Sequence, residues 1–305
     1  MFAITDTTYA GEAASSFIVK STIGNEVVQG GHVYVKDGIK KSYTIPRIVI
    51  GNVIQDRVAT PATSVGTPTI DARVLTPSDY MVYTEFNPRD LEAHWQATRL
   101  NPTLIDRTLP VTVESVLIQE VMKSHNQWLG QALMVGNTAL ASNLKYFNGL
   151  ITRAKADATV PKVTLPVALT VANIETQLNA SLLNCAAAII YNPKLKAFVS
   201  YKTAQLWEQA QRAGGYKGID NTQAGLMRFA GRTIVPLYGM PDDTIFWAIG
   251  SADLSSNLWV GMNSLDDATV QIARLQANSE LYFIKMLMKV DTNYGFGAET
   301  SLYAV

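Results

Sequence analysis

The sequence has little of the residue types on which most metal and thiol chemistry depends. Its 305 residues include one cysteine and three histidines, so no disulfide framework and no cysteine-rich metal site can form within the chain. His32, His94 and His125 are far apart in sequence and match no metal-binding pattern. Cys185 lies in an apolar run, which predicts a small core residue rather than a reactive thiolate. We therefore expect no metal and no cofactor.

Motifs for nucleotide binding and for hydrolysis are also missing. The sequence contains no G-x-S-x-G elbow, no G-x-x-x-x-G-K-[ST] loop and no G-x-G-x-x-G fingerprint after a strand. Asp242-Asp243 and Asp266-Asp267 could be paired catalytic acids, but Pro241 before the first pair and Asn263-Ser264 before the second favour turn and cap roles. We expect no enzyme, and an α/β enzyme that uses one of these pairs is the alternative that a tightly bound ligand would support.

Net charge and long apolar runs are the other missing features. Lys and Arg together number 25, as do Asp and Glu, and charged residues are only 16% of the chain, against about 25% in typical domains. A dedicated nucleic-acid-binding protein would show a basic excess. No apolar run approaches the roughly 18 residues of a membrane span, and residues 1–8 lack the features of a signal peptide. We expect a chain made in the cytosol, with no membrane partner.

What the sequence does contain is an extended two-stranded arm. Residues 39–83 predict paired strands around a polar tip at residues 59–68. The incoming strand, residues 45–54, is rich in β-branched side chains, and the outgoing strand, residues 69–75, alternates apolar and charged ones. A hairpin alone is marginal in water, so the arm requires a neighbouring chain. This feature favours an assembly protein over an enzyme.

The remaining elements predict a mixed α and β domain. Four segments have the cap residues or apolar spacing of helices: residues 88–100, 112–134, 171–183 and 193–213. Five segments have the composition or the alternation of strands: residues 186–191, 233–237, 245–249, 258–260 and 281–290. Residues 291–295 have the composition of a turn. The helix over residues 112–134 would be a rod about 35 Å long.

Short motifs occur in an order that spans nearly the whole chain. The early ones are Tyr9-Ala-Gly-Glu-Ala-Ala14, Gly30-Gly-His-Val-Tyr-Val-Lys36 and Asp71-Ala-Arg-Val-Leu-Thr-Pro77, followed by Phe86 and Trp95. The late ones are Phe229-Ala-Gly-Arg-Thr-Ile-Val-Pro236 and Lys289-Val-Asp-Thr-Asn-Tyr-Gly295. Together with the order of the elements, they resemble the Hong Kong 97-type major capsid proteins of tailed bacteriophages. The early motifs look like those of phages that infect Bacteroidetes, including crAss-like phages.

The resemblance implies an α+β capsid fold with five parts. These would be an N-terminal arm (residues 1–38), an extended E-loop lying over a neighbouring subunit (39–83), a peripheral domain (84–162) with its spine helix (112–134), an axial domain (163–275) and a C-terminal return to the peripheral domain (276–305).

The same resemblance implies a structural major capsid protein of the virion. Its hexamers and pentamers would form a head shell in the host cytoplasm, around double-stranded DNA that is not bound sequence-specifically. Scaffolding, portal and decoration proteins are further possible partners. The alternatives are an encapsulin-like compartment and another virion component, such as a tail or baseplate protein.

Charge is distributed unevenly along this neutral chain. Basic residues gather between residues 194 and 217, whereas residues 240–267 contain aspartates and no Lys or Arg. In a ring of identical subunits these stretches could meet head to tail. The alternatives are two solvated faces, or ion pairs within one subunit. The candidate contacts between subunits, including the charged residues of the arm, are Arg47, Asp56, Arg57, Asp71, Arg73, Lys194, Lys196, Arg212, Lys217, Asp242, Asp243, Asp266 and Asp267.

Overall fold

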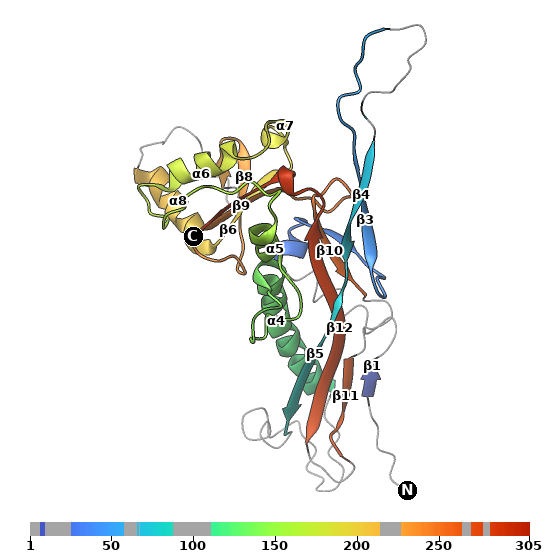
Figure 1. The fold of residues 1–305 in the computed structure, drawn as a ribbon. Helices are drawn as coiled ribbons and strands as arrows, with labels where there is room; N and C mark the ends of the chain where they lie inside the picture. Colours follow the sequence, from blue (N-terminus) through green and yellow to red (C-terminus); the bar gives the residue numbers. More distant parts are fainter. Residues whose placement is uncertain are drawn as a thin grey trace.

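The computed structural model describes residues 7–9, 26–57, 66, 68–87, 111–213, 227–263, 270–276 and 281–305. These residues form two sheets with helices beside them, and a two-stranded arm extends beyond both sheets (Figure 1). The helices and short turns outside the two sheets are α2 (Glu26–Gln29), α4 (Val111–Val135), α5 (Leu150–Ala156), α6 (Ile174–Leu183), α7 (Ala187–Ile190), α8 (Tyr201–Ala213) and the 3₁₀ turn η1 (Gly297–Glu299).

A six-stranded sheet forms the long body of the molecule. Its strands are β1 (Thr7–Tyr9), β11 (Val270–Arg274), β12 (Tyr282–Tyr294), β10 (Leu258–Met262), β2 (Tyr34–Lys36) and β5 (Ser78–Phe86). The 13 residues of β12 pair with β5 and β11 along the first part of the strand and with β10 along the second. Helix α4 runs beside this sheet (Figure 1), and its Leu129 and Leu133 share one core with Ile284 and Met286 of β12.

A five-stranded sheet forms the second body. Its strands, in spatial order, are β13 (Thr300–Ala304), β9 (Thr244–Ile249), β6 (Leu195–Val199), β8 (Arg232–Pro236) and β7 (Arg228–Phe229). Helices α6 and α8 pack against it around a separate core that includes Trp247 and Tyr303. The end of the chain therefore contributes to both sheets, since β12 lies in the six-stranded sheet and β13 pairs with β9.

The longest predicted elements are confirmed. The helix expected over residues 112–134 is α4, and the strand expected over residues 281–290 is the first part of β12, with Ile284, Met286, Met288 and Val290 buried. Strands β8, β9 and β10 occur where three short strands were expected. The helix expected over residues 171–183 begins at Ile174. The helix expected over residues 88–100 lies outside the described residues.

Two predictions in the middle of the chain are wrong. The strand expected over residues 186–191 is the short helix α7. A buried strand would bury most of this apolar run, but two of its alanines are exposed and Ile189 alone is buried there. The helix expected over residues 193–213 begins only at Tyr201. Residues 195–199 form β6, which is buried between β8 and β9. The start signal of α8 is Ser200, whose hydroxyl oxygen accepts a hydrogen bond from the Thr203 backbone N–H at 3.1 Å.

Within the described part of the chain, no helix combines the length and the apolar character that crossing a bilayer requires.

Candidate functional site at the root of the hairpin arm

The predicted two-stranded arm is present, but its incoming strand, expected over residues 45–54, ends at Val49. Strands β3 (Tyr43–Val49) and β4 (Thr69–Leu75) pair antiparallel, with Ile48 opposite Ile70 and Thr44 opposite Val74. These two strands and residues 50–57 are called the hairpin arm below. β3 and β4 form a sheet of their own, and such a pair is marginal in water unless something holds it. Its stability therefore depends on its root, where it meets the two bodies.

The outward face of the hairpin arm is apolar. By register, Pro46, Ile48, Ile70, Ala72 and Val74 lie on one face, and Ile48 and Ile70 are 62% and 73% exposed. The predicted alternation of apolar and charged side chains is confirmed in β4. A strand on a protein surface usually turns its apolar side chains inward, but here the charged side chains point toward the body and the apolar ones toward solvent. Beyond β3, Ile50, Val53 and Ile54 are also exposed. Burial of these side chains by another surface would be favourable.

A small apolar cluster buries the root of the hairpin arm. Ile45 of β3 and Leu75 of β4 are buried with Ile39 and Trp259. Leu75 also lies against Gly261 of β10, where a Cβ would come within 3.2 Å of the Leu75 side chain. The root is thus packed directly on the six-stranded sheet.

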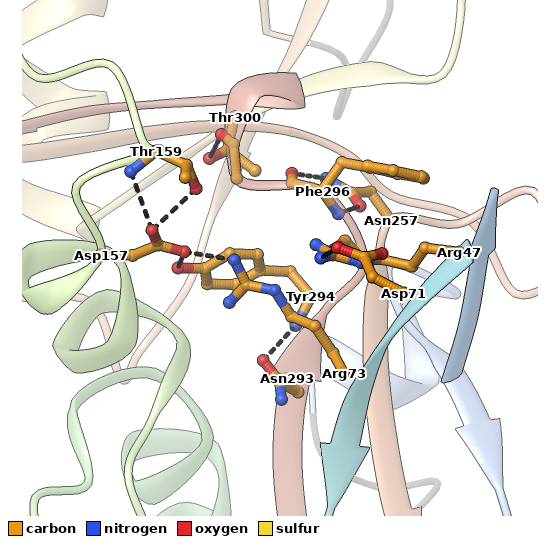
Figure 2. A network of polar contacts seen from close by, with 12 residues as sticks. Arg47, Asp71, Arg73, Asp157, Thr159, Asn257, Asn293, Tyr294, Phe296 and Thr300 are labelled. Carbon is orange, nitrogen blue, oxygen red and sulfur yellow. Dashed lines mark hydrogen bonds and ion pairs between the residues drawn. The ribbon is translucent and has the colours of Figure 1, made fainter. Parts of the chain in front are cut away.

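Arg47 joins the two strands of the hairpin arm to the end of β12. Its Nε donates to Asp71 Oδ1 at 2.8 Å, and the pair is completed by a second contact between Arg47 Nη2 and Asp71 Oδ2. Its Nη1 donates to the carbonyl oxygen of Gly295 at 2.7 Å, and the guanidinium lies 5.3 Å from the centre of the Phe296 ring. One side chain therefore fixes β3, β4 and the turn after β12 together (Figure 2).

Arg73 joins β4 to helix α5 and to β12. Its guanidinium forms an ion pair with Asp157, the residue that follows α5, and lies 4.6 Å from the centre of the Tyr294 ring. Asp157 also accepts hydrogen bonds from the Tyr294 hydroxyl at 2.8 Å and from the Thr159 backbone N–H at 2.8 Å (Figure 2). Burial opposes ionisation, yet the bonds from Arg73 and Thr159 hold the pKa of the Asp157 carboxyl well below its usual range.

Two polar side chains of β12 hold the end of β4. Asp291 accepts the Thr76 backbone N–H at 2.8 Å and forms an ion pair with Arg153 of α5 at 2.8 Å. The Asn293 amide donates to the carbonyl oxygen of Val74 at 3.0 Å. Asp291 is 2% exposed, and burial raises the pKa of its carboxyl although Arg153 opposes the shift.

The turn predicted over residues 291–295 is therefore wrong, since β12 continues to Tyr294. The polar composition that indicated a turn instead serves the root of the hairpin arm. Asp291 and Asn293 are two residues apart, which is the spacing of side chains on one face of a strand. The alternation of residues 281–290 continues through this spacing, and it was the sequence signal that the strand extends beyond residue 290. Asp157 and Arg153 gave no signal, because only the folded chain brings α5 to β4.

The predicted contact residues lie in different parts of the chain. Arg47, Asp71 and Arg73 lie at the root and bind within their own chain, as described above. Asp56 and Arg57 are exposed beyond β3. Lys217, Asp266 and Asp267 lie outside the described residues.

The basic and acidic stretches meet at two points within one chain. Lys194 forms an ion pair with Asp253 at 2.7 Å, and Lys202 forms one with Asp242 at 3.3 Å. The other described residues among the predicted contacts of these stretches also have partners in the chain. Lys196 Nζ is 3.0 Å from His32 Nδ1, Asp243 accepts the Leu169 backbone N–H at 2.9 Å, and Arg212 pairs with Glu208 at 3.4 Å. This arrangement matches the alternative of ion pairs within one subunit.

The described residues offer little for chemistry. No three of their His, Cys, Asp and Glu side chains are grouped so that they could hold a metal ion. Cys185 is buried, and burial raises the pKa of its thiol to about 12. A thiol of that kind stays protonated at neutral pH. The hairpin arm is thus the candidate functional feature.

Comparison with known proteins gives a fold but no family. No protein-family model and no curated protein matches the chain. Solved structures do match. A chain of the satellite phage P4 procapsid is 12% identical with a TM-score of 0.65, covering 98% of this chain and 92% of that one. A capsid chain of a native GTA particle is 12% identical with a TM-score of 0.61, covering 100% and 96%.

A third solved structure is a virus-like particle from Pyrococcus furiosus. Its chain is 9% identical with a TM-score of 0.54, covering 96% of this chain and 99% of that one. The likenesses extend over whole chains, and they show that this protein has the Hong Kong 97-type α+β fold of phage capsid proteins, as the sequence resemblance predicted. The narrower resemblance to phages of Bacteroidetes stays a prediction.

Proposed function

We propose that this chain is the non-enzymatic major capsid protein of a tailed phage, and that its copies assemble into the head shell around double-stranded DNA. The observation that carries the proposal is the hairpin arm. It is held rigidly at its root and presents apolar side chains to solvent, in a chain with a capsid fold. Hexamers and pentamers, assembly in the host cytoplasm and the help of scaffolding, portal or decoration proteins belong to the same proposal.

The parts of the fold would then have the roles that the resemblance implies. The hairpin arm would be the E-loop, and α4 would be the spine helix of a peripheral domain built on the six-stranded sheet. The body around the five-stranded sheet would be the axial domain at the centre of each capsomer. Its bounds would differ from the expected residues 163–275, because β10 and β11 lie in the six-stranded sheet and β13 lies in the five-stranded one. Neutral net charge suits a wall that encloses DNA without sequence-specific binding.

The test replaces apolar side chains on the outward face of the hairpin arm. Burial of one Ile side chain is worth about 1.5–3 kcal/mol, and each 1.4 kcal/mol is tenfold in affinity. The double substitution Ile48→Asp and Ile70→Asp should therefore raise the concentration needed for assembly by roughly a hundredfold or more. Both residues are exposed in the single chain, so circular dichroism and thermal unfolding should change little.

The matched control is Tyr191→Asp. Tyr191 is 87% exposed, and it directly follows α7 in the body of the five-stranded sheet. Sedimentation velocity of the three proteins measures assembly. Normal assembly by the double variant would show that the outward face of the hairpin arm is not a contact between subunits. Deletion of the tip, residues 59–68, should likewise abolish or distort shells and leave the helix content intact.

Part of the charge hypothesis stays within this proposal. Lys194 and Asp242 already have partners in their own chain, so the hypothesis now depends on Asp266 and Asp267, which lie outside the described residues, and on the charged Asp56 and Arg57 of the arm. Reversal of charge at Asp266 and Asp267 should weaken assembly and leave the monomer folded. Unchanged assembly would dispose of a head-to-tail contact through these two residues.

A protein compartment is the second candidate function, and the likeness to the Pyrococcus furiosus virus-like particle favours it. The two candidates differ in what the particles hold. Nuclease-protected DNA in purified particles supports a phage head, and a protein cargo without DNA supports a compartment.

A further inference from the structure

A short segment near the start of the chain joins the two bodies. Residues 26–36, called the strap below, comprise α2, a turn and β2. β2 pairs with β10 of the six-stranded sheet. At the other end of the strap, the Glu26 carboxylate accepts the Tyr238 backbone N–H at 2.8 Å and a hydrogen bond from the Tyr201 hydroxyl, both in the five-stranded body. The strap therefore has one end in each body.

His32 lies where the strap passes from one body to the other. Its Nδ1 is 3.0 Å from Lys196 Nζ of β6. Its ring is edge-on to that of Phe198, with 5.7 Å between the ring centres. Its carbonyl oxygen lies against Gly250 after β9, where a Cβ would come within 2.6 Å of it. One residue of the strap thus makes three contacts with the five-stranded body.

The two glycines before His32 give the imidazole its place. A Cβ on Gly30 would be 2.4 Å from His32 Nε2, so a larger residue at this position would displace the ring. Gly31 has a φ of 62°, a left-handed conformation that glycine adopts at little cost. The sequence Gly30-Gly31-His32 therefore seats the ring against β6 by its backbone as well as by its side chain.

The contact with Lys196 requires a neutral imidazole. An ammonium group only donates hydrogen bonds, so His32 Nδ1 must accept, and the proton of the ring is then on Nε2. A second proton would put an N–H on Nδ1, where it would face the ammonium at 3.0 Å with a like charge. Burial and the Lys196 charge lower the pKa of His32 from 6.5 to about 4, and burial also lowers the pKa of Lys196.

The carboxylates on the neighbouring elements already have other partners. Glu26 of α2 binds Tyr201 and Tyr238, as described above. Beside the turn that contains Gly250, Asp253 forms an ion pair with Lys194 at 2.7 Å. Within the described part of the chain, Lys196 is thus the charged group in contact with the imidazole, and it opposes protonation of the ring.

We propose that uptake of a proton by His32 releases the strap from the five-stranded body, so that the joint between the two bodies loosens in acid. The neutral ring fits the closed joint, and a protonated ring fits only the open one. Between pH 6.5 and pH 4 the open strap therefore binds a proton that the closed strap does not, and opening becomes easier as pH falls. Above this range both forms are neutral and pH has no effect through His32. The inference concerns a single chain and does not depend on the proposed function.

Amide hydrogen exchange of the full chain, corrected for the intrinsic rate at each pH, measures opening of the strap. The shift in pKa corresponds to roughly fiftyfold between pH 7 and pH 4.5 if solvent screened nothing. His32 is only half-buried, so we expect peptides from the strap to lose about tenfold in protection. In His32→Gln, whose amide oxygen can accept from Lys196 but takes up no proton, the loss should be severalfold smaller. Glu26 remains in that variant, so any contribution of its carboxylate is present in both proteins.

Two further variants separate His32 from its surroundings. Lys196→Gln offers an oxygen to a protonated ring and should shrink the loss. His125→Phe removes the other buried histidine, which lies in the six-stranded body, and should leave the response of the strap unchanged. No loss of protection in the native chain, or an equal loss in the native chain and in His32→Gln, would overturn the inference.

Deuterium exchange at the C2 carbon of the imidazole, followed by mass spectrometry across pH, tests the same inference without any variant. The rate of this exchange follows the protonation of each ring. His32 should titrate below pH 5 in the folded chain and near pH 6.5 in urea. Titration of His32 near pH 6.5 in the folded chain would show that the joint tolerates a protonated ring, and it would overturn the inference.

Discussion

Replacement of Arg73 by alanine tests whether the polar root sets the position of the hairpin arm. The variant loses the ion pair with Asp157 and the stacking of the guanidinium on Tyr294. It leaves the apolar cluster around Leu75 in place. The expected effect is therefore a local release of β3 and β4, rather than unfolding of either body.

The structure sets the size of this effect. The side chains of Arg73 and Asp157 are only 21% and 15% exposed, so solvent screens the pair weakly. A hydrogen bond to a charged group contributes about 1.5–3 kcal/mol, and a partly exposed cation over an aromatic ring about 0.5–1 kcal/mol. Asp157 keeps the hydrogen bonds from Thr159 and Tyr294, so its carboxylate still has hydrogen-bond donors in the variant. The sum is about 3 kcal/mol, or roughly a hundredfold in the opening equilibrium.

Amide hydrogen exchange followed by mass spectrometry measures that opening. Peptides covering β3 and β4 should lose protection by about a hundredfold in Arg73→Ala, while peptides from β9 and β6 keep theirs. Arg73→Lys should fall between, because an ammonium keeps the charge without the planar fork. The control is Arg212→Ala, since Arg212 forms an exposed pair with Glu208 on α8, and such pairs contribute little. Equal exchange in Arg73→Ala and Arg212→Ala would refute the argument.

Three further predictions concern the two bodies. Burial lowers the pKa of His125 from 6.5 to about 4, so the unfolded chain binds a proton that the folded chain does not as pH falls from 6.5 to 4. His125 should contribute about 3 kcal/mol to the loss of stability that urea unfolding shows over this range, and His125→Phe should remove that contribution. Burial raises the pKa of the Cys185 thiol to about 12, so a maleimide should label the folded protein far more slowly than the protein in urea, and equal rates would contradict its burial. A Cβ on Gly149 would lie 2.5 Å from backbone atoms of Met134, so Gly149→Ala should lower the free energy of unfolding by about 3 kcal/mol or more. Gly51→Ala has nothing within 4 Å and should change it little.

Strong local patterns made the elements around the hairpin arm predictable. The alternation in residues 69–75 and 281–290 and the long helical run of α4 each specify a period over many residues. The short apolar runs were ambiguous. Residues 195–199 form a buried strand, but a short run of mostly apolar residues also fits a buried helix. Pro193 was therefore taken as the start of a helix, and the helix actually starts at Ser200.

The polar root could not be predicted in the same way. Arg73 and Asp157 are 84 residues apart, and Asp291 is 138 residues from Arg153. Such contacts depend on which elements the fold brings together, and no local spacing encodes them. The charged residues of β4 indicated the polar face of a strand, and that face was taken to be a contact with neighbouring subunits. The structure instead directs it to the body and leaves the apolar face exposed.

The arm indicated assembly from the sequence alone. A hairpin with β-branched residues and a polar tip lacks enough apolar partners of its own. The structure adds that the uncovered face is Pro46, Ile48, Ile70, Ala72 and Val74.

Electron microscopy of the purified full chain, beside its sedimentation profile, tests the central claim most directly. The expected result is closed shells, or rings and sheets of five- and six-membered capsomers, that disappear in the Ile48→Asp and Ile70→Asp double variant. A chain that remains a monomer at every concentration, and that is absent from the shell of particles purified from its source, would contradict the claim that it builds a shell.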